Sequence, residues 1–193
     1  MVRHKVRDER QESILAAAQH LIATHGVDAV SMSSLAESTG LSRPAIYQYF
    51  ASREHVLAEL VINEMADLSN AIDEMIATLD DPMERVRVWL HYSLAHLASA
   101  EHRAIRQISM ATLPDESRGL LRAMHGHFMT ALISPLAELG IPDAPATCHL
   151  LYASVAAAAE RIDEGSDFVR EASALERFAV AGIEGALADR EVN

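Results

Sequence analysis

Hydrophobic side chains recur every three or four residues along most of this 193-residue chain, which is the period of an amphipathic helix. No stretch of the sequence alternates between polar and apolar residues as a strand would. The pattern predicts a first helix over residues 8–25, whose apolar face carries Ile14, Ala17, Ala18, Leu21 and Ile22. The sequence therefore predicts an all-α protein.

Residues 31–50 predict two short helices joined by a tight turn. Ser31 precedes the apolar positions of the first helix and is a candidate side-chain N-cap. Gly40 suits the reversal that ends this helix, because a left-handed backbone costs least for a residue without a Cβ. Ser42 is a second candidate cap, and Pro44 falls in the first turn of the next helix, where its missing N–H loses no intrahelical bond.

The second of these helices has the pattern of a helix that keeps one face exposed for binding. Ile46 and Phe50 are four residues apart and face inward, while Arg43 and Tyr47 are left for other faces. Two helices around a glycine turn, over about 20 residues, form the helix-turn-helix pattern, whose second helix enters the DNA major groove. An ordinary helical hairpin is the alternative. The small residue Ala36 before the turn favours the helix-turn-helix.

Residues 13–60 resemble the N-terminal domain of TetR-family transcriptional regulators. The resemblance rests on an apolar helix, a glycine, the helix-turn-helix, the YxxF-like run Tyr47–Phe50 and the run Ala51–Glu54, which opens a long helix. It covers about a quarter of the chain. The family implies an all-helical protein whose C-terminal part diverges with the ligand.

Carried over position by position, the resemblance implies specific DNA contacts. It implies base contacts from Ser33, Arg43, Pro44 and Ala45, and phosphate contacts from Ser42, Tyr47, Tyr49 and Arg53. Arg43 is the residue expected to bind a guanine through O6 and N7, a pairing that suits a guanidinium. Tyr49 departs from the histidine often found there, and Ser33 is shorter than the residue that some relatives carry.

The rest of the chain predicts one long helix and five shorter ones. The long helix follows Phe50 with an apolar stripe from Val56 to Leu79, or about 40 Å at 1.5 Å per residue. The other helices are expected at residues 83–99, 102–112, 115–139, 146–162 and 167–187. We therefore expect about nine helices, divided into a helix-turn-helix DNA-binding domain at residues 1–55 and a helical ligand-binding and dimerisation domain at residues 56–193.

The last two predicted helices are apolar around more of their circumference than a surface helix should be. Small residues there would let helices approach closely: Ala153, Ala156, Ala157, Ala179 and Ala186. This pattern predicts a homodimer, in which the pair packs with the same pair of a second subunit. Two core helices of a monomer are the alternative.

The resemblance also implies a small-molecule pocket in the C-terminal domain. The candidate lining residues are Trp89, Tyr92, His96, Met110, Met124 and Phe128, with Met129, His91 and His125 as further candidates. Methionines suit a pocket that must adapt to its ligand. The same residues on a helical stripe are more often plain core, and this alternative stays open.

The distribution of charged residues along the chain says more about DNA binding than the net charge does. The net charge of −12 disfavours nucleic acid, but residues 1–55 hold six basic and six acidic residues, whereas the rest holds ten basic and 22 acidic ones. The N-terminal residues Arg3, Lys5 and Arg7 form either a solvated tail or an arm that contacts DNA. Short-range phosphate contacts must therefore supply most of the affinity.

Other classes of protein find little support. The single cysteine, Cys148, excludes an internal disulfide, and no stretch is apolar over about 18 residues, so we expect a cytoplasmic protein without membrane contact. The sequence has no HExxH, GxGxxG, GxSxG or Walker-A motif. No histidine follows Glu or Asp by three residues, as a di-iron bundle requires. We expect no enzyme and no resident cofactor.

These observations together predict a ligand-responsive transcriptional regulator. The expected form is a repressor that binds a palindromic double-stranded DNA operator as a dimer and is released by a small, largely apolar effector. A metal- or haem-sensing regulator of the same fold remains open, prompted by ten histidines. An acidic helical adaptor also remains open, although it gives no reason for Arg43 and Tyr47 on an exposed helix.

Overall fold

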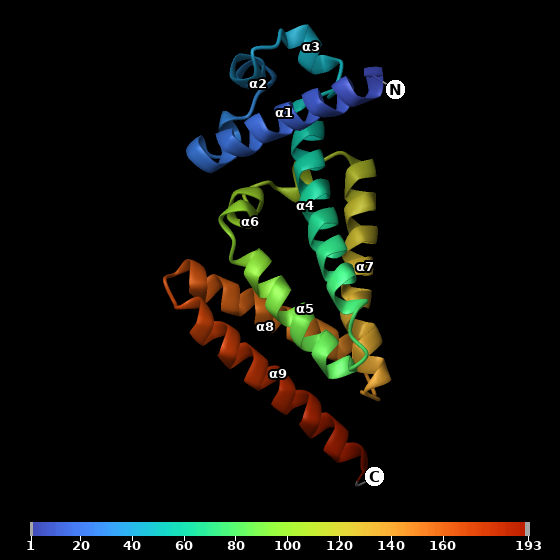
Figure 1. Ribbon diagram of the computed structural model, residues 1–193. Coiled ribbons are helices and arrows are strands. Elements are labelled where there is room, and N and C mark those ends of the chain that lie inside the picture. Colours follow the sequence, from blue (N-terminus) through green and yellow to red (C-terminus); the bar gives the residue numbers. More distant parts are fainter. Residues whose placement is uncertain (1, 192–193) are drawn as a thin grey trace. The chain divides into compact units, whose positions relative to one another are not determined.

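The computed structural model describes the backbone of residues 2–191 and the side chains of residues 9–188. Within these residues the chain forms nine α-helices, two short 3₁₀ helices and no strand (Figure 1), which confirms the predicted all-α class. The elements are α1 (Val2–His25), η1 (Val27–Ala29), α2 (Met32–Thr39), α3 (Arg43–Tyr47), α4 (Arg53–Ile76), α5 (Pro82–Leu97), α6 (Ala100–Ile105), η2 (Met110–Thr112), α7 (Asp115–Glu138), α8 (Ala144–Asp163) and α9 (Phe168–Glu191).

The chain divides into two compact units, and neither unit is continuous in sequence. The first unit comprises the residues up to Met65 together with Ala100–Arg122, and the second comprises Ala66–Ser99 and the residues from Ala123 onward. This differs from the expected division between residues 55 and 56. The reason is that α6, the residues on either side of η2 and the start of α7 supply buried side chains to the core of the first unit: Ala104, Ile105, Ile108, Leu113 and Leu121.

The core of the first unit explains why α2 and α3 are held in place. Ile14 and Ile22 of α1 are no more than 1% exposed, as are Leu35 of α2 and Ile46 of α3. Burying each of these side chains contributes about 1.5–3 kcal/mol. The predicted apolar face of the first helix therefore packs on the helix-turn-helix.

The second unit is built mainly from α5, α8 and α9, which pack on one another. The Trp89 ring is fully buried and lies 4.8 Å from the Phe128 ring, centroid to centroid. The indole Nε1–H of Trp89 donates to the backbone oxygen of Phe128 at 3.2 Å, which satisfies the one polar atom of the ring. Among the described helices, none has the length and apolar character needed to cross a membrane.

Two predicted helices differ from the structure. The first helix begins at Val2 and not at residue 8, so the backbone of the predicted tail or arm is part of α1. The segment 102–112, expected as a single helix, forms α6, a turn and η2. Ile105, Ile108 and Leu113 are all buried in the first unit. Helix α6 ends because the chain turns at residues 106–107, and Ser109 then has an extended backbone (φ −72°, ψ 119°) that leads into η2.

Candidate nucleic-acid interface and ligand site

Helix α2 begins with a closed capping box. The Ser31 hydroxyl accepts a hydrogen bond from the Ser34 N–H at 3.0 Å, and the Ser34 hydroxyl accepts one from the Ser31 N–H at 2.9 Å. The Ser34 hydroxyl is also within hydrogen-bonding distance of the Ala29 carbonyl oxygen, at 2.8 Å. Two of the free N–H groups at this helix end are therefore satisfied by local side chains.

The turn between α2 and α3 has the backbone that the sequence predicted. Gly40 adopts a left-handed conformation (φ +68°), and its N–H donates to the carbonyl oxygens of Ala36 and Glu37. The Leu41 N–H donates to the same Ala36 oxygen at 3.1 Å. Ser42 then caps α3, since its hydroxyl accepts from the Ala45 N–H at 3.3 Å. These bonds fix the direction in which α3 leaves the turn.

Helix α3 has one buried side and one exposed side. Ile46 is fully buried and Phe50 is 5% exposed, so both side chains anchor the segment in the core. Arg43, Pro44 and Tyr47 are exposed, and Tyr47 is 49% exposed. Of the other predicted DNA contacts, Ser33 and Ser42 are exposed, whereas Ala45 and Tyr49 are half-buried.

The Arg43 guanidinium is free to bind a ligand. Among the described residues it has no hydrogen-bond or ion-pair partner, although arginine offers five N–H donors. The predicted basic arm of Arg3, Lys5 and Arg7 has side chains outside the described residues, so its contact with DNA stays a prediction.

Arg53 has partners that the sequence did not reveal. Its Nε–H donates to the Val30 oxygen at 2.7 Å and its Nη2–H to the Val27 oxygen at 2.8 Å. The Asp28 and Glu54 carboxylates each lie 3.8 Å from the guanidinium. The predicted phosphate ligand thus holds the chain between α1 and α2, and its contact with DNA stays a prediction.

The carboxylate beside Arg53 stays ionised. A hydrogen bond from its own backbone N–H and one from the Ser52 hydroxyl lower the pKa of Glu54, and the Arg53 charge lowers it further. A phosphate that approached Arg53 would meet this negative charge. The electrostatics at this position therefore disfavour a strong phosphate contact.

The predicted ligand-site residues do not form a single pocket. Tyr92 and His96 of α5 line a groove of about 280 Å³ in the second unit, together with Asp67, Leu68 and Ala71 of α4 and Ala95 of α5. The sequence analysis missed the α4 residues and Ala95, although their i, i+3 and i, i+4 spacing puts them on one helix face. The groove is the candidate ligand site of the second unit.

The remaining predicted ligand residues lie elsewhere. Trp89 and Phe128 are buried in an aromatic cluster with Tyr152 and His125, in which the Trp89 and Tyr152 ring centroids are 6.3 Å apart. Burial raises the pKa of Tyr152. Met124 is half-buried in the second unit. Met110 belongs to the first unit and is 44% exposed.

Comparison with known proteins finds a family match for the N-terminal segment. A profile of the family described as bacterial regulatory proteins, tetR family, matches residues 14–60. HTH-type transcriptional regulator EthR of Mycolicibacterium smegmatis is 39% identical over 84 residues, which cover 42% of this chain and 37% of that protein. The chain spans about half the length, or less, of the curated relatives it matches.

Solved structures show the same fold over most of the chain. The transcriptional regulator FadR of Bacillus subtilis, in complex with stearoyl-CoA, has a TM-score of 0.74 at 20% identity and covers 89% of this chain and 98% of its own. AibR, in complex with isovaleryl coenzyme A and operator DNA, has a TM-score of 0.72 at 18% identity and covers 86% of this chain and 96% of its own. At these identities the likeness establishes the fold.

Proposed function

We propose that this chain, which belongs by its N-terminal domain to the TetR family of bacterial regulatory proteins, is a transcriptional repressor. It binds a near-palindromic DNA operator as a homodimer, and a small, largely apolar effector releases it. Operator binding places its action in the cytoplasm. It is a regulator and not an enzyme, like the relative that its N-terminal domain matches.

The observation that carries the proposal is the exposed side of α3. Arg43 projects there without a partner among the described residues, while Ile46 and Phe50 hold the other side in the core. A guanidinium held in this way can donate two hydrogen bonds to O6 and N7 of a guanine. Sequence preference would follow, because no other base presents that pair of acceptors in the major groove.

Exposed apolar residues on α8 and α9 support homodimerisation. Leu150 of α8 is 69% exposed and Phe178 of α9 is 64% exposed. Gly182 and Gly185 lie on the same face of α9 as Phe178, and a Cβ added at either glycine would meet nothing within 4 Å. A partner helix can therefore approach this face closely. A two-fold dimer would present two copies of α3 about 34–36 Å apart, which is one turn of DNA.

The groove between α4 and α5 supports a largely apolar effector. Leu68, Ala71 and Ala95 supply its apolar surface, and Tyr92 and His96 supply polar atoms that can orient a ligand. FadR and AibR were solved with acyl coenzyme A compounds, whose acyl groups favour an organic effector with an apolar part here as well. The effector can release DNA only if it binds more tightly to a conformation of the dimer in which the spacing of the two α3 helices does not match DNA.

DNA binding is tested by selecting sequences from a random double-stranded DNA library with the purified protein. The selection is done at about 50 mM salt, because phosphate contacts are little screened there. We expect a palindromic site. Arg43→Ala should lower the affinity for that site by about 1–3 kcal/mol. Arg122→Ala is the matched control, because Arg122 is also exposed. If the protein enriches no DNA sequence, or if both variants bind the selected site equally well, the acidic adaptor is supported instead. Adding metal ions, haem or apolar compounds to the selected complex separates the effector classes.

The oligomeric state needs a separate measurement. Phe178→Glu should convert a dimer into a monomer in light scattering coupled to size-exclusion chromatography, because a charge would be buried in the interface. Val169→Glu is the matched control, since Val169 is 69% exposed and lies half a helical turn away from the face of Phe178. A dimer that persists in Phe178→Glu would contradict the proposed interface.

A further inference from the structure

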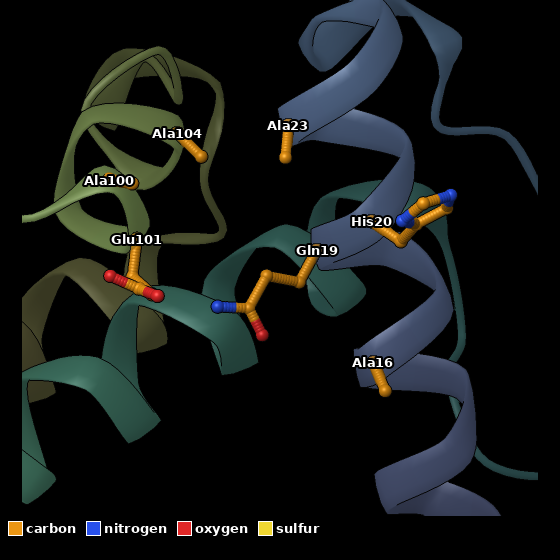
Figure 2. Close-up of a pocket in the computed structure, with 7 residues that line it drawn as sticks. All are labelled: Ala16, Gln19, His20, Ala23, Ala100, Glu101 and Ala104. Carbon is orange, nitrogen blue, oxygen red and sulfur yellow. The ribbon is translucent and has the colours of Figure 1, made fainter.

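The first unit contains a groove that the proposed function does not use. It lies between α1 and α6 and has a volume of about 390 Å³, which is within the range of small-molecule sites. Four alanine methyl groups form its apolar lining: Ala16 and Ala23 from α1, and Ala100 and Ala104 from α6. Figure 2 shows Ala104 and Ala23 on opposite sides of the space between the two helices.

Three polar side chains line this groove. Two of them enter it from opposite walls, and the third, His20, points away from the space between the helices (Figure 2). Figure 2 shows the Glu101 carboxylate of α6 and the Gln19 amide of α1 extending into the space between the helices. Neither side chain has a hydrogen-bond or ion-pair partner among the described residues. The groove therefore offers a negative charge and a primary amide, which has both N–H donors and an acceptor oxygen, beside a surface of methyl groups.

We propose that this groove binds a small organic cation, namely a primary ammonium group on a short hydrocarbon chain. An ammonium has three N–H donors and no acceptor, so it can donate to both the Glu101 carboxylate and the Gln19 amide oxygen. The hydrocarbon chain would cover the alanine methyl groups and remove apolar surface from water. A carboxylic acid of the same length would instead be repelled by Glu101.

The attraction for a cation must come from Glu101 itself. The first unit holds ten basic and eleven acidic residues, so its net charge is only −1, and most of the chain's net charge of −12 lies in the second unit. Helix α1 also packs on α2. A ligand between α1 and α6 would therefore hold the helix that supports the helix-turn-helix. Binding in the groove does not depend on the proposed DNA function.

Nuclear magnetic resonance of the full chain tests the proposal, with ¹³C-labelled alanine methyl groups. Titration with n-hexylammonium should shift the resonances of Ala16, Ala23, Ala100 and Ala104 in a saturable way at millimolar concentration. The expected affinity is low because so small a ligand has few atoms. n-Hexanol should bind at least about threefold more weakly, and n-hexanoate should cause no shift. High salt should weaken binding of the ammonium but not of the alcohol.

Three variants separate the contributions of charge and space. Glu101→Gln should weaken n-hexylammonium binding at least about threefold, whereas Glu160→Gln, which alters an exposed carboxylate of the second unit, should leave it unchanged. Ala23→Leu should abolish binding because it fills the groove. The proposal is overturned if no saturable shift appears, if the shifts fall on alanines of the second unit, or if n-hexanoate binds as well as the ammonium. Unchanged binding by both Glu101→Gln and Ala23→Leu would overturn it too.

Discussion

Replacing Arg53 by alanine is the most informative single change in the helix-turn-helix domain. The structure predicts that Arg53→Ala destabilises the fold, because two hydrogen bonds from a charged donor to the Val30 and Val27 oxygens are lost. A hydrogen bond to a charged group contributes about 1.5–3 kcal/mol. The Val27 oxygen keeps a bond from the Val30 N–H, and the Arg53 side chain is 28% exposed. We therefore expect a net loss of about 2–3 kcal/mol.

Urea unfolding followed by circular dichroism measures this loss, with Arg43→Ala as the control. Arg43 has no partner among the described residues, so its removal should change the free energy of unfolding by less than about 0.5 kcal/mol. Arg53→Lys should be nearly as unstable as Arg53→Ala, because an ammonium cannot reproduce the two directed bonds of a guanidinium.

The opposite result would refute this reasoning. If Arg53 mainly binds phosphate, Arg53→Ala would be as stable as the unmodified chain and would lose DNA affinity as Arg43→Ala does. Arg53→Lys would then retain most of the affinity, since lysine also binds phosphate as a point charge.

Four further predictions each concern a single residue. Gly40→Ala should destabilise the fold by about 1–2 kcal/mol, because Gly40 has φ +68°. Gly119 lies in helix α7 with open space where a Cβ would be added, so Gly119→Ala should stabilise the fold by about 0.5–1 kcal/mol in the same urea assay. The Cys148 thiol, whose pKa burial raises to about 11, should resist alkylation at pH 8 until the chain is unfolded. Hydrogen bonds from Arg161 lower the pKa of Glu171 in the folded chain. The pair therefore stabilises the fold at pH values above the unfolded-state pKa of Glu171. This stabilisation is lost as the pH falls through the lower folded-state pKa. The melting temperature of Glu171→Gln should therefore fall less than that of the unmodified chain between pH 5 and pH 3.

The helix-turn-helix was predictable because its determinants are local. The caps at Ser31 and Ser42 and the left-handed turn at Gly40 each depend on residues within four or five positions. Short-range hydrogen bonding and backbone sterics are nearly independent of the rest of the fold. The all-α class was predictable for a similar reason, since helical periodicity is visible in any window of the sequence.

The features that the sequence missed depend on distant partners. Arg53 binds carbonyl groups 23 and 26 residues earlier in the chain, and no local pattern reports such a contact. The apolar stripe that contains Trp89 predicted either core or pocket, because both need apolar residues at helical spacing. Only the packing of Trp89 on Phe128 shows that its ring is core.

The N-terminal arm should account for most of the salt dependence of DNA binding. Each phosphate that a protein charge neutralises contributes about 0.9 to the slope of log affinity against log salt. Arg53 is bound to the backbone, and tyrosine and serine contacts carry no charge. Arg3, Lys5 and Arg7 are therefore the main candidates.

Deleting residues 1–7 should lower the slope by up to about 2.7 per protomer, which is three contacts at 0.9 each. The preferred sequence should stay the same, because Arg43 remains in place. Fluorescence anisotropy of a labelled operator, measured from low to moderate salt, gives both slopes. An unchanged slope would mean that the side chains of residues 1–7 do not contact phosphate. The affinity would then have to come from the Arg43 base contact and the uncharged contacts on α3, and its dependence on salt would be far weaker than a typical repressor shows.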